Sequence, residues 1–442
     1  MMSFDKIKSD FLHEEYTYFK HKSGLDVYVF PKNMSCTYAL FATKYGSLDN
    51  KFKLEGDRDF TCVPDGIAHF LEHKMFESEN GEDVFLRFAK TGACANAYTS
   101  NNITAYLFSC TDKLYESLEI LLDFVTHPYF TRENVQKEQG IIAQEIKMYD
   151  DHPGSRLYYE LLGALYQKHN VKINVAGTVE SISEITPELL YSCYNIFYNL
   201  NNMPLCVCGS AEAERVCEIC DRILTEAPKQ KIIREYPSEP ANVASEYAEA
   251  HLEVASPMFA IGVKDIEISE DPSVRLRKSA VADIAIKMLF GKTSRFYNEL
   301  YESGLVQPGL NCEYEHNRSF SFMSIDGRSR EPRRVYEYFL KYIKEIKQAP
   351  LPESEFEIAK RVKLASFVGL FDSTDDIANE FLSFIFDGAT VFDYVKALSD
   401  IRYDEVIKFV NELFKESACS LAAVLPLKND LRERSAISSA DA

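Results

Sequence analysis

Two histidines and a glutamate on one short stretch could form part of a metal site. The stretch D-G-I-A-H-F-L-E-H-K-M-F-E spans residues 65–77 and contains His69, Glu72 and His73. In a helix of about 3.6 residues per turn, the two histidines lie one above the other on the same face, with the glutamate beside them. Pro64 and the aspartate that follows it are residue types that favour the start of a helix. The spacing therefore predicts a helix that directs two imidazoles and a carboxylate to one place.

Two neutral imidazoles at this spacing can bind zinc, but a catalytic site needs a third protein ligand and an open position for water. The order H-x-x-E-H reverses the H-E-x-x-H metalloprotease motif and is a zinc signature in its own right. In such a site Glu72 would be the general base and not a ligand. The alternative is a pair of surface histidines on an ordinary amphipathic helix. With only 9 histidines in 442 residues, this motif is uncommon by chance.

A long helix further along the chain offers the missing ligand. It follows Thr131, reads R-E-N-V-Q-K-E-Q-G-I-I-A-Q-E-I-K-M-Y-D-D, and is stopped by Pro153. Glu138 and Glu145 are two turns apart on it and share a face nearly in register. One of them can be the third ligand and the other can support it from behind. The spacing does not decide which, and without the two-histidine helix the pair would be read as solvated acids.

A pair of strands is predicted between these two helices, at residues 95–99 and 103–109, with a polar S-N-N turn between them. The first strand, within A-N-A-Y-T-S, has few bulky aliphatic residues for a core strand. It fits an edge strand whose backbone is available to an extended peptide. The candidate peptide-binding residues are Asn96, Ala97, Tyr98 and Thr99. The alternative is a hairpin with no such role.

Composition narrows the functional classes. A net charge of −19 argues against a nucleic-acid partner, because phosphate binding requires a basic surface. The first fifteen residues contain no apolar run long enough for a signal peptide or a membrane span, so we expect a cytoplasmic protein. Eleven scattered cysteines fit reduced thiols better than a disulfide framework. One group could hold a structural metal, although packed thiols are the simpler interpretation: Cys206, Cys208, Cys217 and Cys220.

The length of 442 residues predicts two domains. The second half repeats the pattern of the first: strand-like runs precede a helix, S-A-V-A-D-I-A-I-K-M-L-F, that resembles I-A-H-F-L-E-H-K-M-F in shape. It lacks metal ligands, since Asp283, Ile286 and Lys287 stand in place of the motif residues. We therefore expect an α+β fold of two duplicated domains, each a mainly antiparallel sheet covered by helices. The predicted boundaries are 1–228 for the zinc-binding domain, 229–246 for a linker, 247–430 for the second domain and 431–442 for a frayed tail.

Together these motifs resemble the insulinase/pitrilysin family of zinc peptidases, which includes the mitochondrial processing peptidases and bacterial processing proteases. The resemblance rests on H-F-L-E-H, on A-N-A-Y-T-S-N-N-I-T-A-Y, which is similar to the family's N-A-x-T edge strand, and on E-Q-G-I-I-A-Q-E-I-K-M-Y-D-D-H-P. It implies one zinc ion per chain, held by His69, His73 and Glu145, with Glu138 as the supporting acid. Each chain would then form half of a clamshell.

The resemblance also implies a function and a partner. The chain would be a zinc-dependent endopeptidase that cleaves or processes extended peptides, acting in a homodimer or beside a related chain that lacks the motif. The family often carries an Arg and a Tyr in its second domain that hold substrate. Here Y-N-E-L-Y-E-S-G-L-V-Q-P-G offers Tyr301 and Gln307, with Arg295 nearby. The alternatives are a non-catalytic structural subunit of a family heterodimer and a zinc hydrolase that does not act on peptide bonds.

Overall fold

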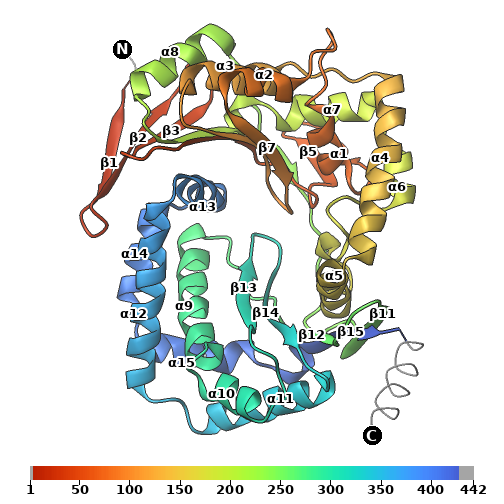
Figure 1. The fold of residues 1–442 in the computed structure, drawn as a ribbon, viewed down its shortest axis with the longest axis vertical. Coiled ribbons are helices and arrows are strands. Elements are labelled where there is room, and N and C mark those ends of the chain that lie inside the picture. The colour runs from red at the N-terminus through yellow and green to blue at the C-terminus, as the bar shows by residue number, and fades with distance from the viewer. Residues whose placement is uncertain (1–2, 428–442) are drawn as a thin grey trace, which may run out of the picture. The chain divides into compact units, whose positions relative to one another are not determined.

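The computed structural model describes residues 3–427, and the predicted frayed tail at 431–442 lies outside them. Helices and mainly antiparallel sheets form two units (Figure 1). Of the described residues, the first unit takes 3–146, 174–236 and 368–386, and the second takes 147–173, 237–367 and 387–427. The predicted α+β architecture is confirmed.

The first unit is built on a seven-stranded sheet in the order β1-β2-β3-β9-β4-β8-β7, antiparallel except where β3 runs parallel to β9. Its strands are β1 (Asp5–Ser9), β2 (Glu14–Lys20), β3 (Asp26–Pro31), β4 (Thr37–Thr43), β7 (Cys94–Thr99), β8 (Thr104–Cys110) and β9 (Pro204–Gly209). A small sheet joins β5 (Lys51–Leu54), β6 (Thr61–Cys62) and β10 (Ile232–Arg234). Because β7 pairs only with β8, it is an edge strand, as the sequence predicts.

The helices of the first unit begin with α1 (Ile67–Lys74), and the long α4 (Arg132–Asp151) crosses the boundary of the unit, which falls after Ile146. The others are α2 (Val84–Thr91), α3 (Leu114–Thr126), α6 (Val179–Ser183), α7 (Pro187–Phe197), α8 (Ala213–Ile223) and α13 (Thr374–Asp387). Alternating residues of the sheet bury both of its faces. Val27 and Val29 of β3 belong to the core shared with α3 and α8, whereas Tyr28 and Phe30 face the other way.

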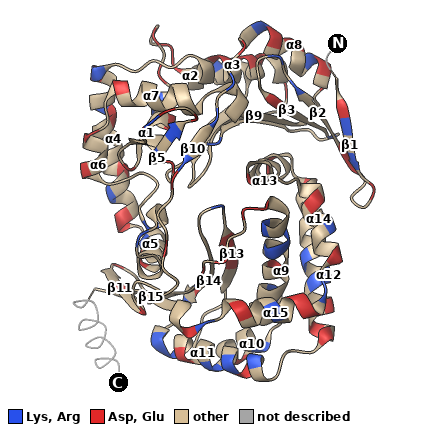
Figure 2. Ribbon diagram, turned by 180° about the vertical axis from the view of Figure 1, so that it is seen from behind, with Lys and Arg blue, Asp and Glu red and all other residues tan. Residues whose placement is uncertain are grey.

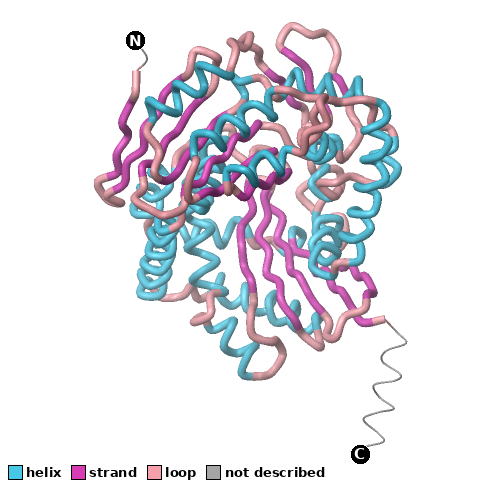
Figure 3. The backbone as a smooth tube through the Cα atoms, turned by 45° about the horizontal axis from the view of Figure 1, so that its top comes forward, coloured by secondary structure: helices cyan, strands magenta, loops and turns pink. Residues whose placement is uncertain are grey.

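The second unit contains a five-stranded sheet in the order β11-β15-β12-β14-β13, and its strands lie side by side in Figure 3. Its strands are β11 (Tyr247–Leu252), β12 (Met258–Asp265), β13 (Asn311–His316), β14 (Ser321–Arg328) and β15 (Cys419–Pro426). Its helices are α5 (Pro153–Leu165), α9 (Pro272–Phe290), α10 (Arg295–Glu302), α11 (Pro332–Gln348), α12 (Glu353–Gly369), α14 (Val391–Asp400) and α15 (Tyr403–Leu413). The parallel pair β11 and β15, followed by antiparallel β12, β14 and β13, repeats the order and direction of β3, β9, β4, β8 and β7.

The two units exchange one helix each. Helix α5 precedes the linker in the chain but packs on β11, β12 and β15 of the second unit. A side chain at Gly262 would clash with Leu165, since a Cβ there would lie 2.7 Å from a methyl carbon of that leucine. Reciprocally, Phe381 of α13 lies against Tyr16, Tyr28 and Phe30 of the first unit. These exchanges differ from the predicted boundaries, which place residues 147–173 and 368–386 with the opposite unit.

The predicted linker at 229–246 is partly structured. Residues 232–234 form β10, which pairs with β5, and Arg234 makes an ion pair of 2.7 Å with buried Asp49. The sequence of this segment has no strand-like alternation, so its pairing depends on a partner strand that is remote in sequence. Residues 237–367, which follow directly, belong to the second unit.

Charge is distributed over both units. Figure 2 shows acidic and basic residues side by side on helices of each unit, with no continuous basic stripe along the described part of the chain. None of the described helices is long and apolar enough to cross a membrane.

Candidate metal centre

Helix α1 presents the motif residues, and a glycine determines where it begins. The helix runs from Ile67 to Lys74, shorter than the stretch 65–77 that the sequence predicts. Its N-cap is Gly66, with φ of 88°, and not Pro64 or the aspartate after it. A Cβ at Gly66 would lie 2.4 Å from the carbonyl oxygen of Ala176, so a glycine is needed both for the left-handed backbone and for this close approach.

His69, His73 and Glu145 converge, the first two from α1 and the third from α4. Their ligand atoms all lie within 4.8 Å of one another. Nε2 of His69 is 3.8 Å from one carboxylate oxygen of Glu145, and Nε2 of His73 is 3.4 Å from the other. Tetrahedral zinc with bonds of about 2.0–2.2 Å holds nitrogen and oxygen ligands roughly 3.3–3.6 Å apart. The donor types and spacing therefore fit a zinc ion.

The surroundings act on the two imidazoles in opposite directions. Burial, together with the nearby His73, lowers the pKa of His69 to about 3, so that ring is neutral at pH 7. Burial opposes a positive charge on His73, but the hydrogen bond to Glu138 and the surrounding carboxylates raise its pKa overall. Nδ1 of His73 lies 3.1 Å from Glu138. Since an ionised carboxylate only accepts hydrogen bonds, Nδ1 carries a proton, and a metal ion that binds Nε2 must displace any proton there.

Glu138 lies behind His73, and a buried lysine holds it there. Nζ of Lys74 is 3.4 Å from Glu138 and 2.7 Å from Glu77. Burial would raise the pKa of Glu138, but the contacts with His73 and Lys74 lower it overall. The structure thus places the two acids of α4 in different positions, Glu145 facing both imidazoles and Glu138 facing the far side of one of them.

Glu72 is bonded to the edge strand and also feels the charges of His73 and Glu145. Its Oε2 accepts a hydrogen bond of 2.7 Å from the hydroxyl of Thr99, the last residue of β7. Burial raises the pKa of Glu72, and the bond from Thr99 partly offsets that rise. A carboxylate with a raised pKa is a stronger base than an exposed one.

Three of the other predicted peptide-binding residues lie on β7, and the fourth lies on α10 of the second unit. Asn96 and Ala97 are on β7, where the amide of Ala97 donates to the side chain of Asn96. Tyr98 directs its hydroxyl to Asn379 of α13, 3.0 Å away. Tyr301 is on α10 of the second unit, 48% exposed and stacked on Tyr297. Its predicted contact with substrate stays a prediction.

In the second unit an ion pair stands where the repeat would place metal ligands. Helices α9 and α12 occupy the positions in the chain order of that unit that α1 and α4 occupy in the first. Asp283 on α9 and Lys363 on α12 are 2.9 Å apart, and the hydroxyl of Tyr394 also donates to Asp283. An aspartate and a lysine neutralise each other and leave no set of three ligands, so the second unit carries no counterpart of the metal centre at this place.

The four cysteines Cys206, Cys208, Cys217 and Cys220 do not form one site. Cys217 and Cys220 of α8 belong to the core on one face of the sheet, together with Leu205 and Val207 of β9. Cys206 and Cys208 alternate with those β9 residues and therefore face the opposite side. The simpler interpretation, packed thiols, therefore applies to Cys206 and Cys208.

Comparison with known proteins agrees with this geometry. The model of the insulinase family (peptidase family M16) matches residues 63–179, and the model of the peptidase M16 inactive domain matches residues 184–363, which include Asp283 and Lys363. An uncharacterized zinc protease of Bacillus subtilis, YmfH, is 38% identical over 430 residues, which cover 96% of this chain and 99% of YmfH. The chain belongs to the insulinase family of zinc metallopeptidases.

Solved structures of M16 proteins share the fold. A putative M16-like peptidase from Alicyclobacillus acidocaldarius has a TM-score of 0.90 and 34% identity over 95% of this chain and 100% of its own. A protease from Helicobacter pylori has a TM-score of 0.80 at 19% identity, over 93% of this chain and 100% of its own. Pitrilysin has a TM-score of 0.72 at 14% identity, over 96% of this chain but 47% of its own. The M16 fold of this chain thus corresponds to about half of pitrilysin.

Two contacts at the metal centre could not be predicted from the sequence. The bond from Thr99 to Glu72 joins residues 27 positions apart, and the side-chain role of this threonine has no local pattern. Lys74 follows the second histidine directly, but a lysine at the end of a helix is normally solvated, and only the fold shows that this side chain is buried.

Proposed function

We propose that this chain is a zinc-dependent endopeptidase that cleaves or processes extended peptides. The observation that carries the proposal is the convergence of His69, His73 and Glu145 within 4.8 Å, with Glu72 beside them and bonded to the edge strand. Family membership supports a peptidase, but M16 chains include inactive domains, so the proposal rests on these side chains.

In the proposed site His69, His73 and Glu145 would hold one zinc ion. Bound zinc acidifies a water molecule and polarises the scissile carbonyl as a Lewis acid. The two imidazoles and one carboxylate form a three-residue set that leaves room for water and substrate. Glu138 would keep His73 in the tautomer that binds metal, since the ring can donate only from Nδ1 to this carboxylate.

Glu72 would be the general base. It takes the proton from the attacking water and then delivers it to the leaving amine, so it is regenerated in each turnover. Its raised pKa, caused by burial, brings the basicity of the carboxylate closer to working pH. Thr99 holds Oε2, which leaves Oε1 for the proton transfer.

The peptide would add to the open edge of β7. An extended peptide that pairs with the backbone of Asn96, Ala97, Tyr98 and Thr99 would pass Glu72, because Thr99 touches that carboxylate. Tyr301 of the second unit is a further proposed contact, tested by whether Tyr301→Phe raises KM.

Glu72→Gln tests the proposal. We expect kcat on a quenched extended peptide to fall by about 100- to 10,000-fold, because the base is lost, while one zinc per chain remains bound. His69→Ala should lose both activity and zinc. Glu79→Gln, an exposed glutamate of the same unit, is the matched control and should change neither. A Glu72→Gln chain that cleaves at the original rate would disprove the assignment. A wild-type chain that binds zinc but cleaves no peptide, even with the related chain added, would favour the alternative, a non-catalytic subunit.

A dimer is part of the same proposal. The chain covers about half of pitrilysin's length, which supports a second chain as the other half of the clamshell. That second chain is either another copy or a relative without H-x-x-E-H. Gel filtration of the chain alone separates the two: a dimer supports the first, whereas an inactive monomer that gains activity on addition of the relative supports the second. The cytoplasmic location stays a prediction.

A further inference from the structure

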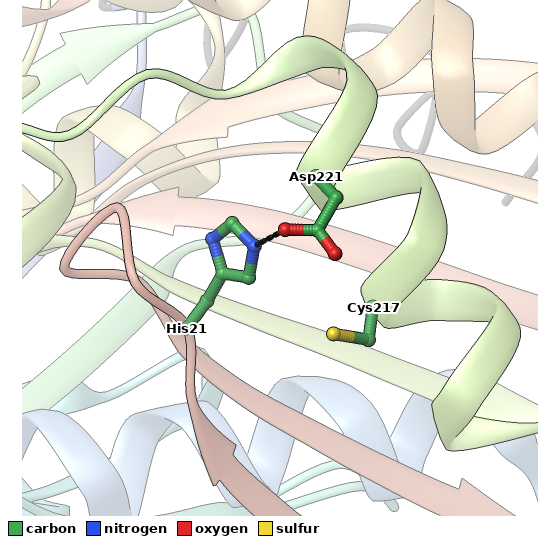
Figure 4. Close-up of side chains that lie close together, drawn as sticks. All are labelled: His21, Cys217 and Asp221. Carbon is green, nitrogen blue, oxygen red and sulfur yellow. Dashed lines mark hydrogen bonds and ion pairs between the residues drawn. The ribbon is translucent and has the colours of Figure 1, made fainter. Parts of the chain in front are cut away.

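A second group of potential metal ligands lies in the first unit, built on elements other than α1 and α4. Figure 4 shows His21, Cys217 and Asp221 directing their side chains toward one another. One ligand atom from each lies within 4.8 Å of those of the other two. The peptidase mechanism proposed above uses none of the three residues.

His21 lies just after β2, in the turn that leads to β3, and its side chain is completely buried. Nε2 is 3.2 Å from Oδ1 of Asp221, close to the separation of two ligands on one tetrahedral metal. Nδ1 is 2.8 Å from the hydroxyl of Ser23. The backbone N–H of Ser23 donates to the same nitrogen at 3.3 Å, so in the metal-free ring the proton lies on Nε2 and is donated to Asp221. A metal ion on Nε2 would therefore require this proton to move to Nδ1, from which it can be donated to the hydroxyl of Ser23. Burial lowers the pKa of His21, which keeps the ring neutral.

Helix α8 supplies the other two ligands. Cys217 and Asp221 are four residues apart, so they share a face of the helix, as paired ligands on one helix must. Cys217 is buried, whereas the side chain of Asp221 is 42% exposed. An ion could therefore enter past the aspartate and keep water as its fourth ligand.

We propose that His21, Cys217 and Asp221 form a second zinc site, which ties the turn after β2 to α8. A thiolate, an imidazole and a carboxylate favour zinc over calcium or magnesium, which prefer oxygen ligands. Binding would displace the thiol proton of Cys217, releasing one proton to solvent.

Lys22 forms an ion pair with one of the proposed ligands, Asp221. Its ammonium group is 2.5 Å from Oδ1 of Asp221, the same oxygen that faces His21. The Lys22 side chain is 65% exposed, so it can move away from Asp221. While the two are paired, the ammonium group neutralises the carboxylate and repels a metal cation. Removing it should therefore strengthen metal binding, whereas a cluster that is only a network of hydrogen bonds would gain no affinity for metal.

Cobalt titration of the full-length apoprotein tests the site. A cobalt–thiolate bond absorbs in the near ultraviolet, and the centre at His69, His73 and Glu145 contains no sulfur. We expect two equivalents of cobalt and this absorption band in the wild type. Cys217→Ser should lose the band and one equivalent, and Cys220→Ser, a buried thiol of the same helix that is outside the cluster, should keep both.

Two further variants keep the test independent of folding and of peptidase activity. Asp221→Asn alters a partly exposed side chain and should weaken zinc binding at this site at least about tenfold. Lys22→Ala should strengthen it roughly three- to tenfold. In a His69→Ala background, zinc should still raise Tm, because the second site remains. Absence of the band from the folded wild type, or its persistence in Cys217→Ser, would overturn the proposal whatever the outcome for the peptidase.

Discussion

Nζ of Lys74 lies 3.4 Å from Oε2 of Glu138, although the lysine side chain has no exposed surface. A buried ammonium group requires a partner, and a carboxylate beside it stays ionised. Glu138 also contacts Nδ1 of His73 from its other oxygen. The lysine therefore acts on the metal centre through Glu138, because an ionised Glu138 can only accept the proton of that ring nitrogen.

Glu138→Gln should weaken zinc binding without removing a ligand. The amide has no negative charge to draw the Nδ1 proton of His73, and loss of such a partner typically lowers metal affinity about 10- to 100-fold. Competition with a chromogenic chelator measures the change. Glu133→Gln, near the start of the same helix, should leave the affinity unaltered. Equal affinities for Glu138→Gln and wild type would show that the carboxylate does not support His73.

Thr99→Val should lower kcat while zinc stays bound. The hydroxyl that donates to Glu72 is lost, and one hydrogen bond of about 1–1.5 kcal/mol corresponds to a roughly 5- to 13-fold loss of rate. Because this bond lowers the pKa of Glu72, its removal raises that pKa. The acid limb of the rate profile should move to higher pH, so the deficit is larger at pH 6 than at pH 8. Thr99→Ser retains the hydroxyl and should restore both the rate and the profile.

The sequence predicts which candidate side chains share one face of a helix. His69, Glu72 and His73 lie within two turns of one helix, and Glu138 and Glu145 within two turns of another, so helical geometry alone places each set on one face. The approach of α4 to α1 is a long-range relation, and the choice of Glu145 as the ligand came from a family resemblance.

The exchanged helices could not be predicted in the same way. The apolar face of α13 contains Phe381 and that of α5 contains Leu161 and Leu165, but an apolar face does not specify which sheet it will cover. The predicted boundaries place α5 in the first domain and α13 in the second. In the structure α5 belongs to the second unit and α13 to the first. The duplication itself, in contrast, is visible in the strand-like runs and the similar helix that recur in the second half of the sequence.

Phe381→Ala tests the exchange of α13. The ring contacts Tyr16, Tyr28 and Phe30, so its removal leaves a cavity in the first unit, and we expect a loss of about 3–5 kcal/mol in the free energy of unfolding. Hydrogen exchange should show the lost protection at β2 and β3, more than 300 residues earlier in the chain. Phe11→Ala removes a ring that is 55% exposed and should have little effect. Protection lost only in the second unit would contradict the exchange.

Glu315 should make the stability of the second unit depend on pH. Burial raises the pKa of this β13 carboxyl from 4.5 to about 7, with the hydrogen bond from Tyr158 opposing the rise and the charge of Glu313 adding to it. The folded chain therefore binds this proton more tightly than the unfolded chain, so the contribution of Glu315 to stability is full below pH 4.5 and is lost as pH rises to about 7. The loss amounts to at most roughly 3 kcal/mol. Glu315→Gln should remove it, since the amide cannot ionise and can still accept from Tyr158.

Urea unfolding at pH 5 and pH 8 measures this difference. The free energy of unfolding of Glu315→Gln, relative to wild type, should be higher at pH 8 than at pH 5, because only the wild type must hold a buried charge at the higher pH. Glu337→Gln, an exposed position on α11, should show the same small difference at both. If Glu315→Gln and wild type differ by the same amount at both pH values, the carboxyl is already ionised at pH 5, and its burial does not control the stability of β13.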